Sequence, residues 1–284
     1  MRRLAAALFA CALAPAAAEV PERWYLRLDN DAFFNTDRWY SSGLRLARVD
    51  PRGGHEIELG ILQEIYTPEV KRYEFGVVDR APTARLMLAA ARHERSPQLF
   101  QTVEVALGVR GPAALGRQVT GLTHRVVAAR DIVWSRQESN RFDGLAAAAR
   151  THRGGRFAVH YGAVLGNQVA FAHTGADLRF GSPGEATFVL RHASTPPGGE
   201  DARGWGGFAG ASVRRVARNE MLHRQYTAFA PGLERRNIVT RIAAGISWSR
   251  PSFEVSLAIV RESREFEGQR VPHGYGSLTL HAAF

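Results

Sequence analysis

The feature that most constrains this chain is an alternation of apolar and polar residues at its end. Leu278, Leu280 and Phe284 fall on one side of the alternation, and Ser277 and Thr279 fall on the other. Successive side chains of a β-strand point to opposite faces, so this period of two predicts a strand with one apolar face. An amphipathic final strand that ends in an aromatic residue is typical of bacterial outer-membrane barrels, where one face meets lipid and the other lines the lumen.

The same alternation recurs along the chain and predicts twelve strands, separated by stretches rich in glycine and proline. The segment 111–130 does not alternate, and its spacing of Ala, Leu and Val predicts a short helix between two strands. We therefore expect an all-β fold, a transmembrane antiparallel β-barrel of twelve strands with a short helix in an extracellular loop. The strands are expected at 22–31, 39–50, 55–66, 82–93, 98–109, 141–151, 155–166, 168–180, 205–218, 235–249, 251–263 and 274–284.

The composition is compatible with a barrel, although it resembles that of a basic soluble protein. Of 284 residues, 45% are hydrophobic and 23% are charged, and the mean hydropathy is −0.21. A polytopic helical membrane protein is excluded, because each span needs about 20 consecutive apolar residues and the one long apolar run of this sequence is at its N-terminus. A barrel is not excluded, since lumen-facing polar residues offset the lipid-facing ones. A soluble β-sandwich has the same alternation and stays open on this pattern alone.

The N-terminal segment has the pattern of a secretory signal peptide. Residues 1–18 contain two arginines, then an apolar stretch, and end in three alanines at Ala18. The stretch is short for a membrane anchor, and small residues typically precede a signal-peptide cleavage site. We expect cleavage after Ala18, with residues 19–284 forming one outer-membrane domain that lacks Cys11, the single cysteine. Export also argues against a nucleic-acid partner, despite a formal net charge of +10.

Polar residues cluster where the first predicted strand meets the second. Asp29, Asn30 and Asp31 stand there in sequence, and such oxygen-bearing side chains suit a hard cation such as Ca²⁺. The alternation places Asn30 on the outward, apolar side and the two aspartates on the inward side. A polar side chain facing lipid is costly without a partner, which favours a function for Asn30. The alternative is a solvated hairpin, because Asp and Asn favour turns.

A histidine and several arginines also stand apart from the barrel pattern. His124 lies in the predicted helix, and an ordinary pKa of about 6.5 suits a general base, although a plain surface histidine is the alternative. The arginines in 214–218 and 261–265 could pair inside the lumen or contact anionic lipid, and lumen pairing is favoured. Lys71 is the one lysine, so the basic excess is nearly all arginine, which binds phosphate through paired hydrogen bonds. No serine nucleophile elbow, zinc motif or phosphate loop is present.

Taken in order, short motifs along most of the mature chain resemble the outer-membrane lipid A 3-O-deacylases, the LpxR-type family. The motifs are Asp29-Asn30-Asp31 with Thr36-Asp37-Arg38, Tyr66-Thr67-Pro68, Asp79-Arg80, Gly108-Val109-Arg110-Gly111-Pro112 with Gln118 and His124, Phe208-Ala209-Gly210-Ala211, Val216-Ala217-Arg218-Asn219, Arg264-Glu265-Phe266-Glu267-Gly268-Gln269 and Gly276-Ser277-Leu278. The resemblance implies a twelve-stranded barrel with its site on the outer wall, under a helix from an extracellular loop. It also implies a calcium-dependent ester hydrolase that removes 3′-linked acyl chains from lipid A.

The resemblance further implies a role for each matching residue. His124 is the general base that activates water, and Ca²⁺ stabilises the oxyanion. Asn30 and Asp31 match the pair that organises the metal and the catalytic site. The remaining matches are a catalytic hydroxyl, Ser41, and two substrate-binding residues, Arg80 and Gln118. The expected partners are lipid A of lipopolysaccharide and the surrounding outer-membrane lipid, with the protein as a monomer.

The sequence departs from the family pattern in the segments 40–43, 79–84 and 132–140. The base and the acidic pair survive, while the residues expected to line the substrate change. Two alternatives therefore stay open. One is a non-enzymatic or degenerate outer-membrane barrel, and the other is an outer-membrane phospholipase, which acts on the same kind of bond in a different lipid.

Overall fold

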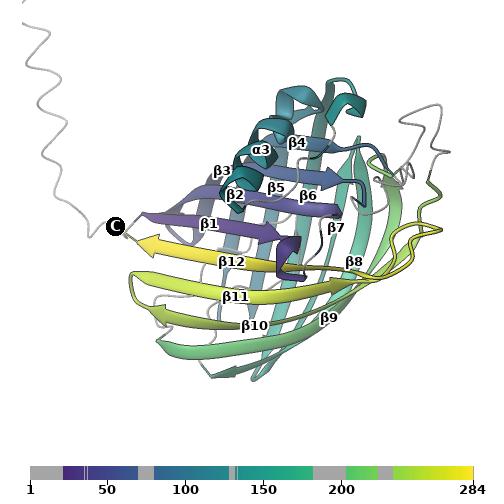
Figure 1. Ribbon diagram of the computed structural model, residues 1–284. Coiled ribbons are helices and arrows are strands. Elements are labelled where there is room, and N and C mark those ends of the chain that lie inside the picture. Colours follow the sequence, from purple (N-terminus) through teal and green to yellow (C-terminus); the bar gives the residue numbers. More distant parts are fainter. Residues whose placement is uncertain are drawn as a thin grey trace, which may run out of the picture.

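Antiparallel pairing of consecutive strands builds a closed barrel in the computed structural model (Figure 1). The barrel closes where β1 pairs with β12, and its twelve strands confirm the expected fold. The structure describes residues 22–34, 36, 38–69, 80–127, 132, 134–181, 203–222 and 233–283, so the predicted signal peptide 1–18 lies outside the described residues. The strands are β1 (Arg23–Asn30), β2 (Trp39–Arg52), β3 (His55–Thr67), β4 (Thr83–Arg95), β5 (Leu99–Arg110), β6 (Arg141–Gly154), β7 (Phe157–Gly166), β8 (Val169–Gly181), β9 (Gly204–Asn219), β10 (Ile238–Arg250), β11 (Phe253–Glu262) and β12 (His273–Ala283).

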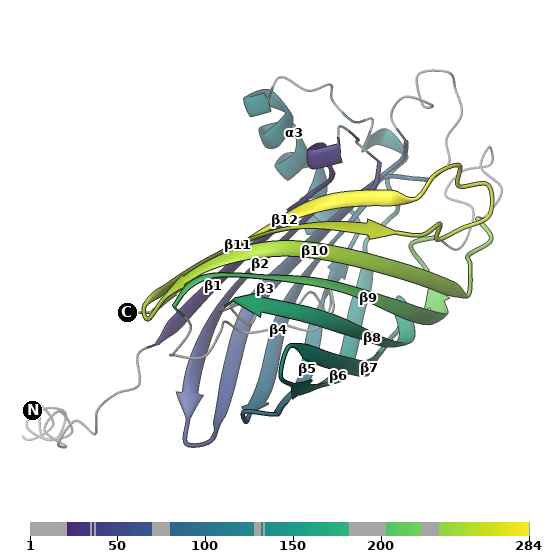
Figure 2. The ribbon, with the colours of Figure 1, turned by 90° about the horizontal axis from the view of Figure 1, so that it is seen from below.

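The two ends of the barrel differ. Tight turns join β2 to β3, β4 to β5, β6 to β7 and β10 to β11 at the end where β1 begins and β12 finishes, and Figure 2 shows the C-terminus at this end. The opposite end carries the helical turns η2 (Asp31–Phe34), η3 (Pro112–Ala114) and η4 (Trp134–Arg136), and the helix α3 (Gly116–Val127). Outer-membrane barrels have short periplasmic turns and longer extracellular loops, so η2 and α3 lie at the extracellular end.

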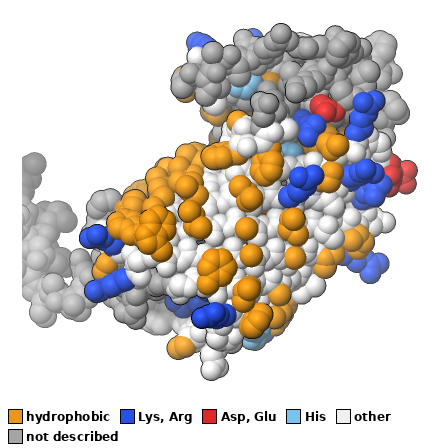
Figure 3. Space-filling view, turned by 60° about the horizontal axis from the view of Figure 1, so that its bottom comes forward, with side chains coloured by type: hydrophobic (Ala, Val, Ile, Leu, Met, Phe, Trp, Pro, Cys, Tyr) orange, Lys and Arg blue, Asp and Glu red, His pale blue; other side chains and the backbone are white. Residues whose placement is uncertain are grey.

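Alternation separates an apolar exterior from a polar interior. Large apolar side chains are exposed on the outside, among them Leu88 at 69% and Ile242 at 58%, and Figure 3 shows such side chains spread along the outer wall. Exposed apolar side chains on this scale are stable where lipid covers them. Within the described residues, no helix has the length and apolar character needed to cross a membrane.

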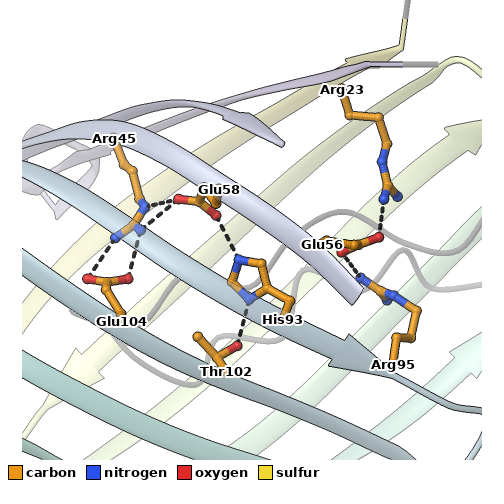
Figure 4. A network of polar contacts seen from close by, with 8 residues as sticks. All are labelled: Arg23, Arg45, Glu56, Glu58, His93, Arg95, Thr102 and Glu104. Atoms are coloured by element: carbon orange, nitrogen blue, oxygen red, sulfur yellow. Dashed lines mark hydrogen bonds and ion pairs between the residues drawn. The ribbon is translucent and has the colours of Figure 1, made fainter. Parts of the chain in front are cut away.

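Buried ion pairs hold the strands together from inside (Figure 4). Arg45 Nη2 lies 2.6 Å from Glu58 Oε1 and 2.7 Å from Glu104 Oε2. The two ring nitrogens of His93 extend the network, one 3.2 Å from Glu58 and the other 2.8 Å from the hydroxyl of Thr102. These contacts join β2, β3, β4 and β5. Breaking one of them would leave a buried charge without a partner, which is costly, so the network holds the four strands together.

The strand and helix predictions agree with the structure apart from element ends. The expected helix within 111–130 is the turn η3 followed by α3. The largest difference among the strand starts is in β10, which is expected from 235 but begins at Ile238. Arg235 has left the ladder there, because its main chain forms an isolated bridge with Phe266 and its guanidinium binds carbonyl oxygens of β9.

Candidate active site on the outer wall

The polar residues at the end of β1 divide between the two faces of the wall, as the alternation predicts. Asp29 and Asp31 are buried, whereas Asn30 is half-buried on the same side as the exposed Leu28. Asn30 pairs with Ser42 of β2 on one side and with Gly276 of β12 on the other. An outward-facing amide therefore stands at the extracellular end of the lipid-facing wall.

The turn η2 lies flat against the outside of β12, next to Asn30. A Cβ atom on Gly276 would come within 2.4 Å of the Phe33 ring, and one on Gly274 within 3.0 Å of the Phe34 ring. Only glycine at these positions lets both rings approach the strand so closely. Phe33 is nevertheless 65% exposed, so η2 presents an apolar edge to lipid beside the polar pair.

Asp31 and Asn30 hold η2 in this position. Oδ2 of Asp31 accepts hydrogen bonds from the main-chain nitrogen of Arg38 at 2.8 Å and from the hydroxyl of Thr36 at 3.2 Å. Oδ1 of Asn30 accepts one from the main-chain nitrogen of Ala32 at 2.8 Å. Both side chains thus stabilise the turn through its backbone, as Asn and Asp commonly do.

Helix α3 is anchored to the outside of β3 and β4. Ile65 and Ala84 pair across these strands, point outward and are buried, since they pack with Ala114 and Trp134 in one cluster. Gly116 permits the close approach, because a Cβ atom there would lie 2.5 Å from Cβ of Ala84. The start of α3 therefore docks tightly on the wall.

Polar contacts fix the segments on either side of α3. Nη2 of Arg110 lies 2.9 Å from Oε1 of Glu138, and Arg141 lies 3.2 Å from the same oxygen. Partial burial raises the pKa of Glu138, while the positive charges of Arg110 and Arg141 oppose that shift. The main-chain nitrogen of Ala113 donates to Oδ1 of Asn140 at 2.7 Å. The connection between β5 and β6 is thus held to the rim at both ends.

Between η2 and α3 lies a part of the outer wall that we call the β1–β2 strip, with Leu28, Asn30, Ser42, Leu44 and Leu46 pointing outward. Asn30 and Ser42 form its extracellular end, and the leucines continue toward the periplasm. Figure 2 shows η2 and α3 on the same side of the barrel at the same end. The strip therefore joins an apolar surface to a polar pair, which suits the boundary between an acyl chain and a headgroup.

A β-bulge decides which serine belongs to the strip. The pairing of β2 with β3 shifts between Tyr40 and Ser42, which leaves Ser41 as the extra residue. Ser41 is buried and its hydroxyl bonds to that of Thr67. Ser42, which the sequence comparison did not select, faces outward beside Asn30. Such bulges are common next to active sites. In the sequence, the signal for this bulge was the break in alternation at the adjacent aromatic residues Trp39 and Tyr40, which are both buried in the structure.

The two predicted residues of α3 lie on different parts of the helix. Gln118 is exposed on its first turn, and His124 is half-buried about two turns after the anchoring residue Gly116. A rise of 1.5 Å per residue puts His124 about 12 Å along the axis from Gly116. Nε1 of Trp134 donates to the hydroxyl of Thr120 at 3.1 Å. The contacts that fix α3 are therefore made mainly before His124.

Arg80 lies inside the mouth of the barrel rather than on the strip. Its Nη2 donates to the main-chain oxygen of Met221 at 2.9 Å, and its guanidinium lies 5.0 Å from the centre of the Tyr66 ring. Tyr66 packs with Tyr40 and Tyr275 in the lumen. The predicted contact of Arg80 with substrate has no support from this position.

Among the described residues, the side chains at the extracellular end of the strip offer oxygen atoms as metal ligands, which fits a hard cation. They are the carboxylate of Asp31, the amide oxygen of Asn30 and the hydroxyl groups of Thr36 and Ser42. In the part of the chain that the structure describes, no three His, Cys, Asp or Glu side chains gather as a metal site. Because Ca²⁺ takes about six to eight oxygen ligands, main-chain oxygens and water would complete such a shell. Asp37 lies outside the described residues.

Comparison with known proteins agrees with this architecture. The family model of outer membrane protein LpxR matches residues 4–284. The structure of LpxR from Salmonella typhimurium is similar with a TM-score of 0.74 at 18% identity, covering 92% of this chain and 100% of that chain. The translocator domain of the autotransporter NalP from Neisseria meningitidis has a TM-score of 0.47 at 11% identity, covering 100% and 94%. The search of curated proteins finds no match. Since the family model spans nearly the whole sequence, the chain belongs to the LpxR family of outer membrane proteins.

Proposed function

We propose that this protein is a calcium-dependent ester hydrolase that removes 3′-linked acyl chains from lipid A in the outer leaflet. Family membership supports a lipid A deacylase. The observation that carries the proposal is the outward-facing pair of Asn30 and Ser42 on the lipid-facing wall. Oδ1 of Asn30 accepts a hydrogen bond from the main-chain nitrogen of Ala32, while the amide NH2 group of Asn30 and the hydroxyl of Ser42 still face the membrane. Polar groups there are costly without partners, and an ester group at the edge of the acyl layer would supply one.

The order of side chains along the β1–β2 strip suggests how the lipid lies. Leu28 pairs with Leu44, and Asn30 pairs with Ser42 one step closer to the extracellular end. An acyl chain that follows the leucines would bring its ester linkage level with the polar pair. The sugar of the lipid would then point out of the membrane, toward α3.

Each residue near the strip has a distinct task in this proposal. His124 is the base, because a neutral imidazole can take a proton from water near neutral pH. A base acts within about 3 Å of the proton donor, so we expect substrate and water between α3 and the strip. Asn30 and Asp31 would hold the Ca²⁺, whose charge stabilises an oxyanion when the ion is bound. Asp31 also fixes the turn that follows Asn30, through Arg38 and Thr36.

We assign the hydroxyl role to Ser42 in place of Ser41. Ser42 faces the strip, whereas the hydroxyl of Ser41 is bonded to Thr67 within the wall. Gln118 is exposed on α3 and stays a candidate for contact with the sugar. The position of Arg80 in the mouth of the barrel favours a structural role there.

The test is mass spectrometry of lipid A from cells that express the protein. We expect loss of the 3′-linked acyl chains with the wild type and intact lipid A with His124→Ala. His152→Ala is the matched control, because His152 is an exposed histidine on the outer face of β6. Intact lipid A with both wild type and control would refute the proposal and favour a non-enzymatic barrel.

A second assay separates the lipid A hydrolase from an outer-membrane phospholipase. Purified protein is incubated with lipid A and with phosphatidylethanolamine in parallel, with calcium and with a chelator. The proposal predicts that fatty acid is released from lipid A and not from the phospholipid, and that this release occurs with calcium and not with the chelator. Equal release from the phospholipid would instead support the phospholipase.

A further inference from the structure

The arginines of 214–218 divide between the two sides of the wall. Arg214 points into the lumen, where its Nη2 lies 2.9 Å from Oε1 of Glu262, and Arg241 lies 2.8 Å from the same oxygen. Arg215, the next residue, is exposed on the outer face near the extracellular end of β9. Lumen pairing, which the sequence favoured, therefore accounts for Arg214 and leaves Arg215 without an assigned role.

A bulge in β9 brings a second arginine to the same outer surface. Pairing with β8 shifts at this point, so that Ala217 is the extra residue and Arg218 is exposed beyond it. Nη1 of Arg218 lies 3.4 Å from the main-chain oxygen of Asn167. Arg235 holds the bulge open, because its guanidinium donates to the carbonyl oxygens of Val216 and Ala217, both at 2.8 Å.

We call Arg215, Arg218 and Arg235 the β9 arginine cluster. Among the described residues, no acidic side chain forms an ion pair with Arg215, Arg218 or Arg235. The acceptors of Arg218 and Arg235 are carbonyl oxygens and the Asn237 side chain. By contrast, Arg236 pairs with Glu267 at 2.8 Å. Within the described part of the chain, the cluster therefore presents guanidinium groups without a carboxylate partner at the edge of the membrane.

The surface on the periplasmic side of the cluster is apolar. Ile238 pairs with Arg215 across β9 and β10 and is 52% exposed, and Ile242 and Ile259 continue the apolar surface. Figure 3 shows basic side chains at both ends of the apolar band on this wall. A cationic group level with Ile238 and above Ile242 matches an amphiphile with an anionic head and acyl chains. Water-soluble anions would not use the apolar part.

The cluster is far from the β1–β2 strip. Going round the barrel, β9 is five strands from β4, which carries α3, and four strands from β1. Figure 1 shows β9 and α3 on opposite sides of the barrel. A lipid on this wall would therefore be a different molecule from the substrate.

We propose that the β9 arginine cluster binds a phosphate group of a second, non-substrate lipid A molecule in the outer leaflet. Guanidinium groups bind phosphate oxygens through two parallel hydrogen bonds. Arg215 and Arg218 would make these bonds, while Arg235 positions them by fixing the bulge. This inference rests on the outer-membrane setting of the family and not on the proposed hydrolysis.

The test is native mass spectrometry of the detergent-purified protein with bisphosphorylated lipid A. All proteins carry His124→Ala, so the lipid stays intact whether or not the enzyme is active. We expect two bound lipids on the parent protein. One of them should bind about tenfold more weakly to Arg215→Gln/Arg218→Gln. The expected loss is moderate because exposed charge-assisted contacts contribute less binding free energy than buried ones. Arg150→Gln/Arg156→Gln is the control, because it removes two exposed arginines at the periplasmic end.

Three results would overturn the proposal. They are unchanged binding to the Arg215→Gln/Arg218→Gln variant, an equal loss in the control, and equal binding of phosphatidylglycerol or dephosphorylated lipid A to the parent. A separate Arg215→Gln/Arg218→Gln variant that keeps His124 should deacylate lipid A like the wild type. If no protein shows hydrolysis, the proposed function fails, while the binding comparison still decides this inference.

Discussion

Replacing Gly116 by alanine should lift α3 from the wall without disturbing the barrel. The new Cβ atom would lie 2.5 Å from Cβ of Ala84 and 2.7 Å from the Trp134 ring. Carbon atoms in contact lie about 3.5–4.0 Å apart, so the helix must move by about 1 Å or more. A displacement of about 1 Å in a catalytic group can cost about 100-fold in rate. We therefore expect Gly116→Ala to lower the rate of lipid A deacylation by about 100-fold.

Gly121→Ala is the matched control for this prediction. It makes the same change in the same helix, but nothing lies within 4 Å of the Cβ position. Both variants replace a glycine of α3 by alanine, so a difference between them reports the clash. The double variant Ala84→Gly/Gly116→Ala removes the closest atom and should recover part of the activity.

The assay is deacylation of lipid A by purified protein, followed by mass spectrometry, with the melting temperature of each variant measured in parallel. All variants should melt close to the wild type, because α3 lies outside the strand pairing. Full activity in Gly116→Ala, or an equal loss in Gly121→Ala, would show that docking of α3 does not position the base.

Three other changes test separate parts of the structure. Ser42→Ala should lower deacylation at least tenfold more than Ser41→Ala, because Ser42 alone of the two faces the strip; the reverse order would restore the role expected from the sequence. Glu262→Ala should destabilise the barrel by about 3 kcal/mol in urea unfolding, since it leaves two buried arginines, Arg214 and Arg241, without a shared carboxylate; an unchanged midpoint would show that the lumen is hydrated enough to replace it. Chelation of calcium should abolish deacylation, and added Ca²⁺ should restore it while Mg²⁺ should not, because Mg²⁺ demands a stricter octahedral shell; full activity in chelator would exclude the metal.

Local patterns were enough to predict the barrel and its strands. The period of two is a property of each strand alone, and it identified the outward side of Asn30 as well as the twelve strands. The family resemblance selected Ser41 as the catalytic hydroxyl, but a bulge in the pairing of β2 with β3 leaves Ser41 as the extra residue, and Ser42 is the serine that faces outward beside Asn30. The resemblance also could not place Arg80, which follows a connection between strands and bonds to Met221, 141 residues away in sequence.

The sequence by itself determined the alternation, the strand count, the helix between β5 and β6 and the family to which the chain belongs. These features depend on neighbouring residues or on short motifs. Tertiary structure alone decided which serine joins Asn30, which arginines face lipid, and where α3 meets the wall. Each of these depends on register or on the close approach of distant residues, as when Gly116 packs on Ala84, and no local pattern encodes such contacts.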